Sequence, residues 1–279
     1  MLSVVLSTGR NITSKKTVTY TNQKAQFFLS QTVLFAAATL LFLGFGIKSF
    51  LDMALETVVF GFIYGVLLIL SQWMLTLALK NGNTSVCSVV YSLGFILPTV
   101  SGTLFWSEDF GGLQLIGVFV SVVVILLTAK KGRTEKKKEN KFFVPCILIA
   151  MLSSGGLGIM QKVQQSSAAA NEKGAFLFVA FCFAFCCSFA AFLLSHEKTG
   201  FPVQRTLYPA LTGLCFGGAN LCNTILAGKM KSAVFFPLQN ISTILFTTLL
   251  GVFLFKEKLT LKTTIILILG VIVIILFSL

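Results

Sequence analysis

The chain has 279 residues, of which 56% are hydrophobic and only 11% are charged, and its formal net charge is +13. So few charged residues exclude an ordinary water-soluble globular protein, and the composition favours a polytopic membrane protein. Nucleic acid is not an expected partner, because the basic residues lie in predicted loops, where anionic lipid and the positive-inside rule account for them.

Nine apolar stretches are long enough to cross a bilayer, which takes about 20 residues of helix. In chain order they are predicted at residues 26–47, 57–79, 84–105, 112–129, 142–161, 174–195, 207–228, 232–255 and 260–278. Residues 1–12 precede them and are interpreted as the end of a further helix whose beginning is missing. The predicted fold is an all-α membrane protein, a polytopic helical bundle on a ten-helix plan with the first helix truncated and about nine full spans.

The sequence predicts that the helices form two copies of one unit. A shift of 149 residues superimposes corresponding positions, namely Lys80 on Lys229, Gly102 on Gly251, Glu108 on Glu257, Ser71 on Asn220 and Tyr91 on Asn240. Because each copy has an odd number of helices, five, the second inserts with the opposite orientation and the two form an inverted repeat. The predicted boundaries are residues 1–129 for the first half, 130–141 for a basic linker and 142–279 for the second half.

The distribution of Lys and Arg between the loops predicts the orientation in the membrane. Of the 22 such residues, 17 lie in connections that follow odd-numbered helices, among them Arg10 and the 130–141 linker, and 5 lie in the other connections. The positive-inside rule therefore places the linker on the cytoplasmic side of the cell membrane and the C-terminus outside.

The sequence offers little for metal or covalent chemistry. Its seven cysteines fall within apolar segments, where they are interpreted as small packing residues, and its single histidine, His196, lies in a predicted loop. One histidine and nine scattered acidic residues do not supply the clustered groups of an intramembrane enzyme. We therefore expect no metal, no cofactor and no enzymatic activity.

Polar side chains inside the predicted helices are the candidates for a substrate cavity, because burying them costs free energy unless they are bonded. The candidate cavity residues are Gln72, Trp73, Tyr91, Ser92, Gln161, Asn220, Asn223, Gln239 and Asn240. Pro237 is expected to open the helix that carries Gln239 and Asn240. Packing between helices is the alternative explanation for these residues. Glu108 and Glu257 are expected to cap or pair locally at the membrane surface.

Two segments share one order of features: "LALKNGNTSVCSVVYSLGFILPTVSGTLFWSEDFGGLQLIG" and "ILAGKMKSAVFFPLQNISTILFTTLLGVFLFKEKLTLKTTIILILG". Each has a helix ending in a small-residue or Lys turn, a helix with scattered polar residues, a Glu and a closing helix with Gly. This order resembles the drug/metabolite transporter superfamily, specifically its EamA-like branch, over essentially the whole chain. The resemblance implies an integral membrane secondary transporter or exporter of small metabolites that works by alternating access.

The predicted cavity residues favour uncharged solutes. No Asp or Glu lies in the middle of a complete predicted span, and proton-coupled exporters of hydrophobic cations need such a carboxylate. Amide and aromatic side chains suit amino-acid-like or other neutral or zwitterionic solutes. The competing hypothesis is a lipid-handling or structural membrane protein, such as a scramblase. The expected partners are a small-molecule substrate and membrane lipids, and a homodimer is left open.

Overall fold

The computed structural model describes residues 1–19, 24–43, 53–81, 84–109, 111–128, 142–195, 203–255 and 261–278. Most of these residues are helical, and no strand occurs among them. The predicted linker at 130–141, His196 and Glu257 lie outside the described residues.

The helices follow one another with short connections. They are α1 (Leu2–Thr19), α2 (Lys24–Leu43), α4 (Leu55–Asn81), α5 (Thr84–Ser92), α6 (Ile96–Trp106), α7 (Gly112–Thr128), α8 (Phe143–Ser166), α9 (Lys173–Leu194), α10 (Val203–Lys229), α11 (Ser232–Phe255) and α12 (Leu261–Ser278). Short 3-10 segments precede α6 (η1, Leu93–Phe95) and α9 (η2, Ala170–Glu172). Among the described residues, 7 helical stretches are long and apolar enough to cross a membrane. This confirms the predicted all-α polytopic fold.

The first helix is longer than the sequence suggested. The apolar stretch was expected to end near residue 12, but α1 continues to Thr19. Its threonine hydroxyls bond to carbonyls of the preceding turn, as Thr8 does to Val4 at 2.8 Å and Thr13 does to Gly9 at 2.9 Å. These bonds satisfy the threonine hydroxyls inside the helix, so the polar side chains do not require a loop here.

The helices of the second half begin at the spacing that the predicted repeat requires. A shift of 149 residues carries Lys24, where α2 begins, onto Lys173, where α9 begins, and carries Gly112 of α7 onto Leu261 of α12. Corresponding helices also pack together, α2 with α9, α6 with α11 and α7 with α12. The same order of helices therefore recurs in both halves, whereas their opposite orientation in the membrane stays a prediction.

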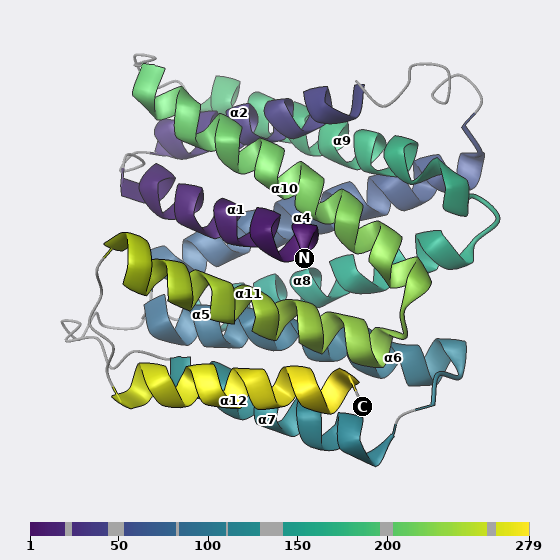
Figure 1. Cartoon of the computed structure of the whole chain (residues 1–279). Helices are drawn as coiled ribbons and strands as arrows, with labels where there is room; N and C mark the ends of the chain where they lie inside the picture. Colours follow the sequence, from purple (N-terminus) through teal and green to yellow (C-terminus); the bar gives the residue numbers. More distant parts are fainter. Residues whose placement is uncertain are drawn as a thin grey trace. The chain divides into compact units, whose positions relative to one another are not determined.

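The chain divides into two compact units, and each takes helices from both predicted halves. The first unit comprises Met1–Val66 and Val163–Ile225. Within it α2 and α9 lie side by side (Figure 1). Phe181 of α9 stacks on Phe42 of α2 with 5.6 Å between ring centroids. Aromatic rings bury more apolar area than other side chains, so this stack forms the core of the pair.

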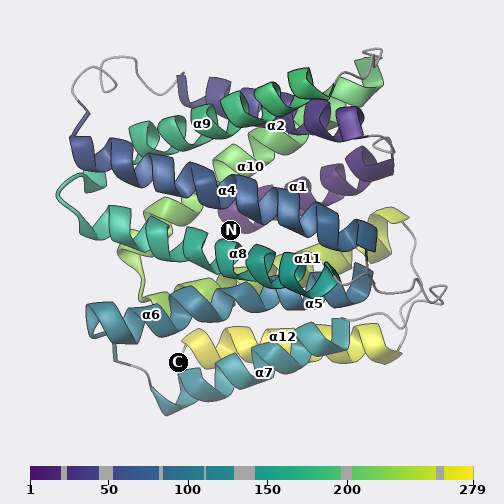
Figure 2. The same cartoon turned by 180° about the vertical axis from the view of Figure 1, so that it is seen from behind.

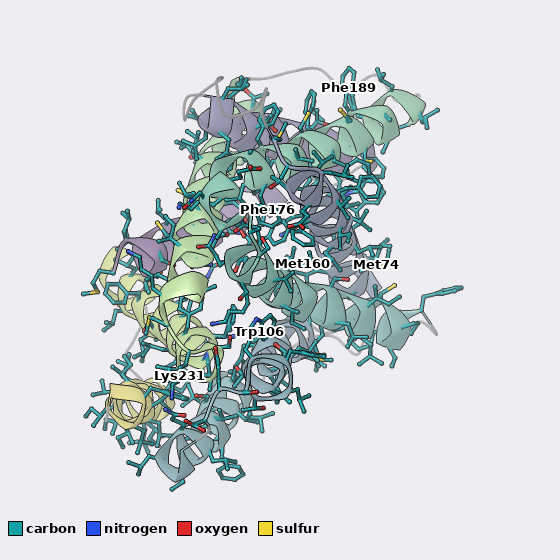
Figure 3. All side chains as sticks on the ribbon, turned by 90° about the vertical axis from the view of Figure 1, so that its right-hand side faces the viewer. Met74, Trp106, Met160, Phe176, Phe189 and Lys231 are labelled. Carbon is teal, nitrogen blue, oxygen red and sulfur yellow. The ribbon has the colours of Figure 1, made fainter. Side chains whose placement is uncertain are left out.

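Helix α9 has one face inside this unit and one outside. Phe176 is fully buried, whereas Phe189 is exposed and lies at the outer side of the helix (Figure 3).

Two glycines of α4 let this helix approach the buried face of α9. A Cβ atom on Gly61 would lie 2.9 Å from the Phe176 carbonyl oxygen, and one on Gly65 would lie 2.8 Å from that of Ala180. This is the close backbone approach that small residues allow between membrane helices.

The second unit comprises Leu67–Lys162 and Leu226–Leu279. Within it α7 and α12 lie side by side (Figure 2), and α11 packs against both and against α6. The buried core of this group consists of Val124, Ile241, Leu245, Ile266, Val273 and Phe277. Gly270 of α12 makes the contact close, since a Cβ atom there would lie 2.4 Å from a methyl carbon of Leu245.

Candidate functional site

One predicted span of the second unit is broken in the middle. The 3-10 segment η1 separates α5 from α6, and the Ile96 N–H bonds to the Leu93 carbonyl instead of reaching back to Ser92. Pro98 follows in the first turn of α6. Proline has no N–H and its ring crowds the carbonyl four residues before it, here that of Gly94, so Pro98 favours a break in the α-helix at the turn before it.

Polar side chains gather where the helix is broken. The hydroxyls of Tyr91 and Ser71 share a hydrogen bond of 2.9 Å, which joins α5 to α4. The Asn240 side-chain amide of α11 donates to the Ser92 carbonyl at 3.0 Å, which Ile96 has left open. The structure therefore bonds Asn240 to Ser92, and it bonds Tyr91, the residue before Ser92, to Ser71. We call these four residues the unit-two polar cluster.

Helix α8 presses against the broken segment through glycines. A Cβ atom on Gly155 would lie 2.6 Å from the Gly94 carbonyl oxygen, and one on Gly158 would lie 2.8 Å from the Pro98 ring. No side chain fits in either place. This crossing holds the break against α8 and so fixes the segment that carries Tyr91 and Ser92.

A second set of polar contacts lies in the first unit. The Tyr64 hydroxyl donates to the Asn220 side-chain oxygen at 2.6 Å, and the Asn220 amide donates to the Phe216 carbonyl at 2.8 Å. The Ser3 hydroxyl donates to the Asn223 side-chain oxygen. Asn220 and Asn223 therefore join α10 to α4 and α1, and both predicted residues have hydrogen-bond partners inside this unit.

The remaining predicted residues are placed on helices of the second unit. Gln72 and Trp73 are partly buried on α4, Gln161 is buried on α8, and Gln239 is partly buried on α11. Their role as cavity residues stays a prediction. The expectation that Pro237 opens its helix was wrong, since α11 runs unbroken from Ser232 to Phe255. Pro237 removes one hydrogen bond near the start of α11, and packing on α6, α7 and α12 keeps the helix together.

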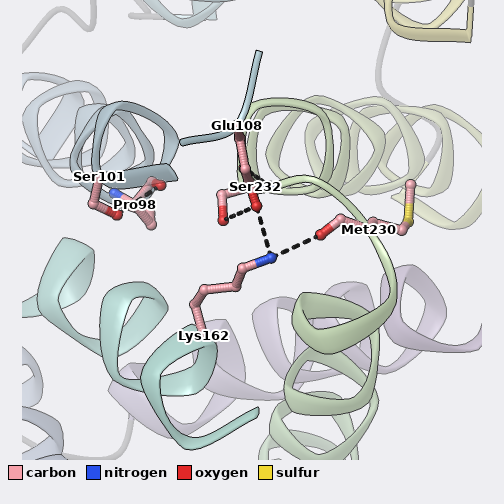
Figure 4. Close-up of polar contacts among 6 residues, drawn as sticks. All are labelled: Pro98, Ser101, Glu108, Lys162, Met230 and Ser232. Atoms are coloured by element: carbon pink, nitrogen blue, oxygen red, sulfur yellow. Dashed lines mark hydrogen bonds and ion pairs between the residues drawn. The ribbon is translucent and has the colours of Figure 1, made fainter. Parts of the chain in front are cut away.

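A buried ion pair holds the turn between α10 and α11 (Figure 4). The Lys162 ammonium lies 2.7 Å from the Glu108 carboxylate and donates to the Met230 carbonyl at 3.2 Å. The same carboxylate accepts the Ser232 backbone N–H at 2.6 Å. Glu108 thus faces the positive N-terminal end of α11, and Lys162 faces a carbonyl at the C-terminal end of α10. The prediction that Glu108 caps and pairs locally is confirmed.

A second carboxylate, in the first unit, was not expected from the sequence. Glu172 accepts the Thr57 hydroxyl at 2.6 Å and the Ala54 backbone N–H at 3.1 Å, both at the start of α4. It therefore satisfies groups that the first turn of a helix leaves open. The only sign of this contact in the sequence is a Glu just before an apolar stretch, and the sequence does not show which residues that Glu binds.

Arg10 does not lie in a loop, as the charge count assumed. It lies within α1, and its guanidinium carbon is 3.9 Å from the centre of the Phe216 ring. Metal ligation has no support in this part of the molecule: across the described ranges no three His, Cys, Asp or Glu side chains group closely enough to hold an ion.

Comparison with known proteins identifies the family. A family model described as "Sugar transport protein" matches residues 29–279, which is most of the chain. The chain belongs to the sugar transport protein family. This family is part of the drug/metabolite transporter superfamily, so the resemblance to the superfamily is confirmed, but the EamA-like branch is not shown. This sugar transport family member is therefore a multi-pass membrane transporter.

The fold of this sugar transport family member is also found in solved structures. One crystal structure, described only as "Crystal structure of protein", aligns with a TM-score of 0.78, covering 99% of this chain and 93% of that chain. The two sequences are 16% identical, so the likeness concerns the fold alone. No curated protein matches the chain.

Proposed function

We propose that the protein takes up a sugar across the cell membrane by alternating access. The observation that carries the substrate class is the match of the sugar transport family over residues 29–279. Alternating access is the usual mechanism of transporters built from repeated helical units, and the recurrent helix order supports it.

The unit-two polar cluster supports an uncharged, oxygen-rich solute. Its groups are two hydroxyls, an amide and a backbone carbonyl, provided by Tyr91, Ser71, Asn240 and Ser92. Each group both has a partner in the protein and keeps further hydrogen-bonding capacity, since hydroxyls and amides have several donor and acceptor positions. A monosaccharide offers the matching set, several hydroxyls that donate and accept.

Two other functions compete with this proposal. The residue types alone also fit amino-acid-like solutes, but the family match gives these no support. A lipid-handling protein would use the same fold without a solute. Reconstitution separates the three. Proteoliposomes loaded with an unlabelled monosaccharide should accumulate the labelled sugar by exchange, and amino acids in excess should not compete.

Asn240→Ala is the variant that connects the flux to the cluster. It should lower sugar exchange at least tenfold at equal amounts of folded protein, because it leaves the Ser92 carbonyl without its donor. Thr103→Val is the matched control, since it removes an exposed hydroxyl of α6 outside the cluster. Exchange of amino acids alone, or movement of fluorescent phospholipid between leaflets without sugar exchange, would overturn the proposal.

A further inference from the structure

Arg10 lies in a helix that runs antiparallel along α10 within the first unit. Contacts at both ends of the pair establish this. The Ser3 hydroxyl donates to Asn223, and the Thr13 and Thr212 hydroxyls are 2.8 Å apart. Residues with higher numbers in α1 therefore lie next to residues with lower numbers in α10. Arg10, between the two contacts, meets Phe216.

This contact lies at the middle of a candidate membrane span. Phe216 is the central residue of α10, which has 27 residues. At 1.5 Å per residue it is about 20 Å from either end of the helix. Most of α10 is long and apolar enough to cross a bilayer. The guanidinium of Arg10 is therefore placed far from both ends of the span and not at a membrane surface.

The Phe216 ring is a fixed platform for the charge. The ring is 5% exposed and meets the Phe181 ring edge-on at 5.6 Å. The Arg10 guanidinium lies over it at 3.9 Å. This stacking covers one face of the guanidinium, whereas its five N–H donors point outward in the plane of the group. Among the residues that the structure describes, none forms an ion pair or a hydrogen bond with that guanidinium edge.

The energy balance favours a partner for this charge beyond those that the described residues supply. A charged side chain at the centre of a membrane span is costly, by several kcal/mol or more. A cation–π contact returns only about 0.5–2 kcal/mol. Water or ligand oxygen atoms at the guanidinium edge would supply the stabilisation that the described residues do not. In transporters, charged residues at this depth mark the path of the solute.

We propose that Arg10 is a substrate-contacting residue of the transporter, a role that rests on the proposed sugar transport. Its planar edge donates two parallel hydrogen bonds to a pair of adjacent oxygen atoms on the solute. That pair is either two neighbouring hydroxyls of a neutral sugar or the carboxylate of a sugar acid, and guanidinium geometry suits both. Phe216 is a positioning residue, which holds the guanidinium plane in one orientation.

Exchange kinetics in proteoliposomes test this role. The variants are Arg10→Gln, which removes the charge, and Arg10→Lys, which keeps the charge but loses the planar edge. Both should raise the KM of the carried sugar at least tenfold and change its kcat less than threefold. Phe216→Leu should raise KM by a smaller factor, because the edge remains but is less well held. Lys229→Gln is the control, since it removes an exposed positive charge from α10 and should leave KM unchanged.

The solutes are measured separately, with glucose and ribose as neutral sugars and glucuronate as a sugar acid. If the Arg10 variants raise the KM of the solute that the protein carries, the proposal is supported. The identity of that solute then shows whether the paired oxygen atoms are sugar hydroxyls or a carboxylate. If both Arg10 variants exchange sugar with an unchanged KM, the proposed role of Arg10 is overturned and the proposed sugar transport is not. The absence of any sugar exchange by the wild-type protein overturns the proposed function instead.

Chemical modification tests the site where the variants fail to fold. The chain has three arginines, Arg10, Arg133 and Arg205, so changing the last two to lysine leaves Arg10 as the single target of phenylglyoxal. We expect phenylglyoxal to modify Arg10 from the aqueous phase and the carried sugar to slow the modification at least threefold. Failure of the reagent to modify Arg10, or modification at the same rate with and without sugar, overturns the proposal.

Discussion

The Glu108 carboxylate and the Lys162 ammonium lie 2.7 Å apart, with 9% and 12% of their side chains exposed. The pair also binds both sides of the turn between α10 and α11, through the Ser232 N–H and the Met230 carbonyl. Gly102 makes room for it, since a Cβ atom there would lie 2.4 Å from the Glu108 carboxylate. A nearly buried ion pair is costly to break because removing one charge leaves the other without a counter-ion.

Glu108→Gln should lower the free energy of unfolding by about 3 kcal/mol, since Lys162 then keeps an unpaired charge. Lys162→Met should cost a similar amount. The double variant should cost less than the two single losses together, because the pair is removed as a whole. The midpoint of thermal unfolding in detergent measures all three. Lys231→Met is the control, because Lys231 is exposed at a neighbouring position. If the double variant lost as much stability as the two single variants together, Glu108 and Lys162 would not be coupled.

Gly155→Ala should sharply reduce the yield of folded protein. The new Cβ atom would lie 2.4 Å from a methyl carbon of Leu97 and 2.6 Å from the Gly94 carbonyl oxygen, and a backbone atom cannot move aside as a side chain can. Overpacking of this kind costs about 1–3 kcal/mol or more. The fraction of monodisperse protein after size-exclusion chromatography measures the loss.

Gly174→Ala is the matched control for that change. No atom lies within 4 Å of the position that its Cβ would take. Gly174 is the second residue of the helix α9, where alanine suits the helical backbone at least as well as glycine. Its yield should therefore equal or exceed that of the wild type. Equal losses at Gly155 and Gly174 would show that the α8 crossing tolerates a methyl group.

Most helices could be predicted because apolar length alone marks a membrane span. The prediction failed where a helix is polar. Residues 13–19 contain Thr, Ser and Lys, and hydropathy treats them as a loop, but backbone and hydroxyl bonding within α1 keeps them helical. The prediction of a loop at Arg10 was wrong for the same reason, because a charged residue in α1 has the hydropathy of a loop residue.

The candidate site could be predicted in its members but not in its pairings. Tyr91, Ser92 and Asn240 stand out as polar residues in apolar helices, and the structure bonds Asn240 to Ser92 and Tyr91 to Ser71. Tyr91 bonds to Ser71, but the sequence singled out Ser71 only because the predicted repeat aligns it with Asn220. The contact of Glu172 with Thr57 joins residues 115 positions apart in the chain, and one sequence holds no information on such a pairing.

Glu172→Gln should lower the free energy of unfolding by about 1 kcal/mol, the usual effect of losing a charged group that caps a helix start. It weakens the bonds to the Thr57 hydroxyl and the Ala54 N–H by removing the negative charge that strengthens them. Glu56→Gln is the matched control, because Glu56 is exposed in the first turn of the same helix. Thermal unfolding midpoints compare the two. A larger effect at Glu56 would mean that helix-dipole charge, not the Glu172 contact, stabilises α4.

Tyr91→Phe should raise the KM of the carried sugar about tenfold, since one neutral hydrogen bond to a solute contributes about 0.5–1.5 kcal/mol and Ser71 also loses its partner. Ser71→Ala should have a smaller effect, because it removes only the group that orients the Tyr91 hydroxyl. The double variant should resemble Tyr91→Phe alone. Such non-additivity is expected when one residue acts through the other.

Proteoliposome exchange separates this role from packing, because it reports KM and kcat at equal amounts of folded protein. Tyr64→Phe is the matched control, since Tyr64 is fully buried in the first unit and bonds to Asn220. Loss of the Tyr64 hydroxyl should lower the midpoint of thermal unfolding and leave the KM of the sugar within threefold of the wild-type value. If Tyr91→Phe also lowers only the midpoint, the unit-two polar cluster holds helices together and the sugar binds elsewhere.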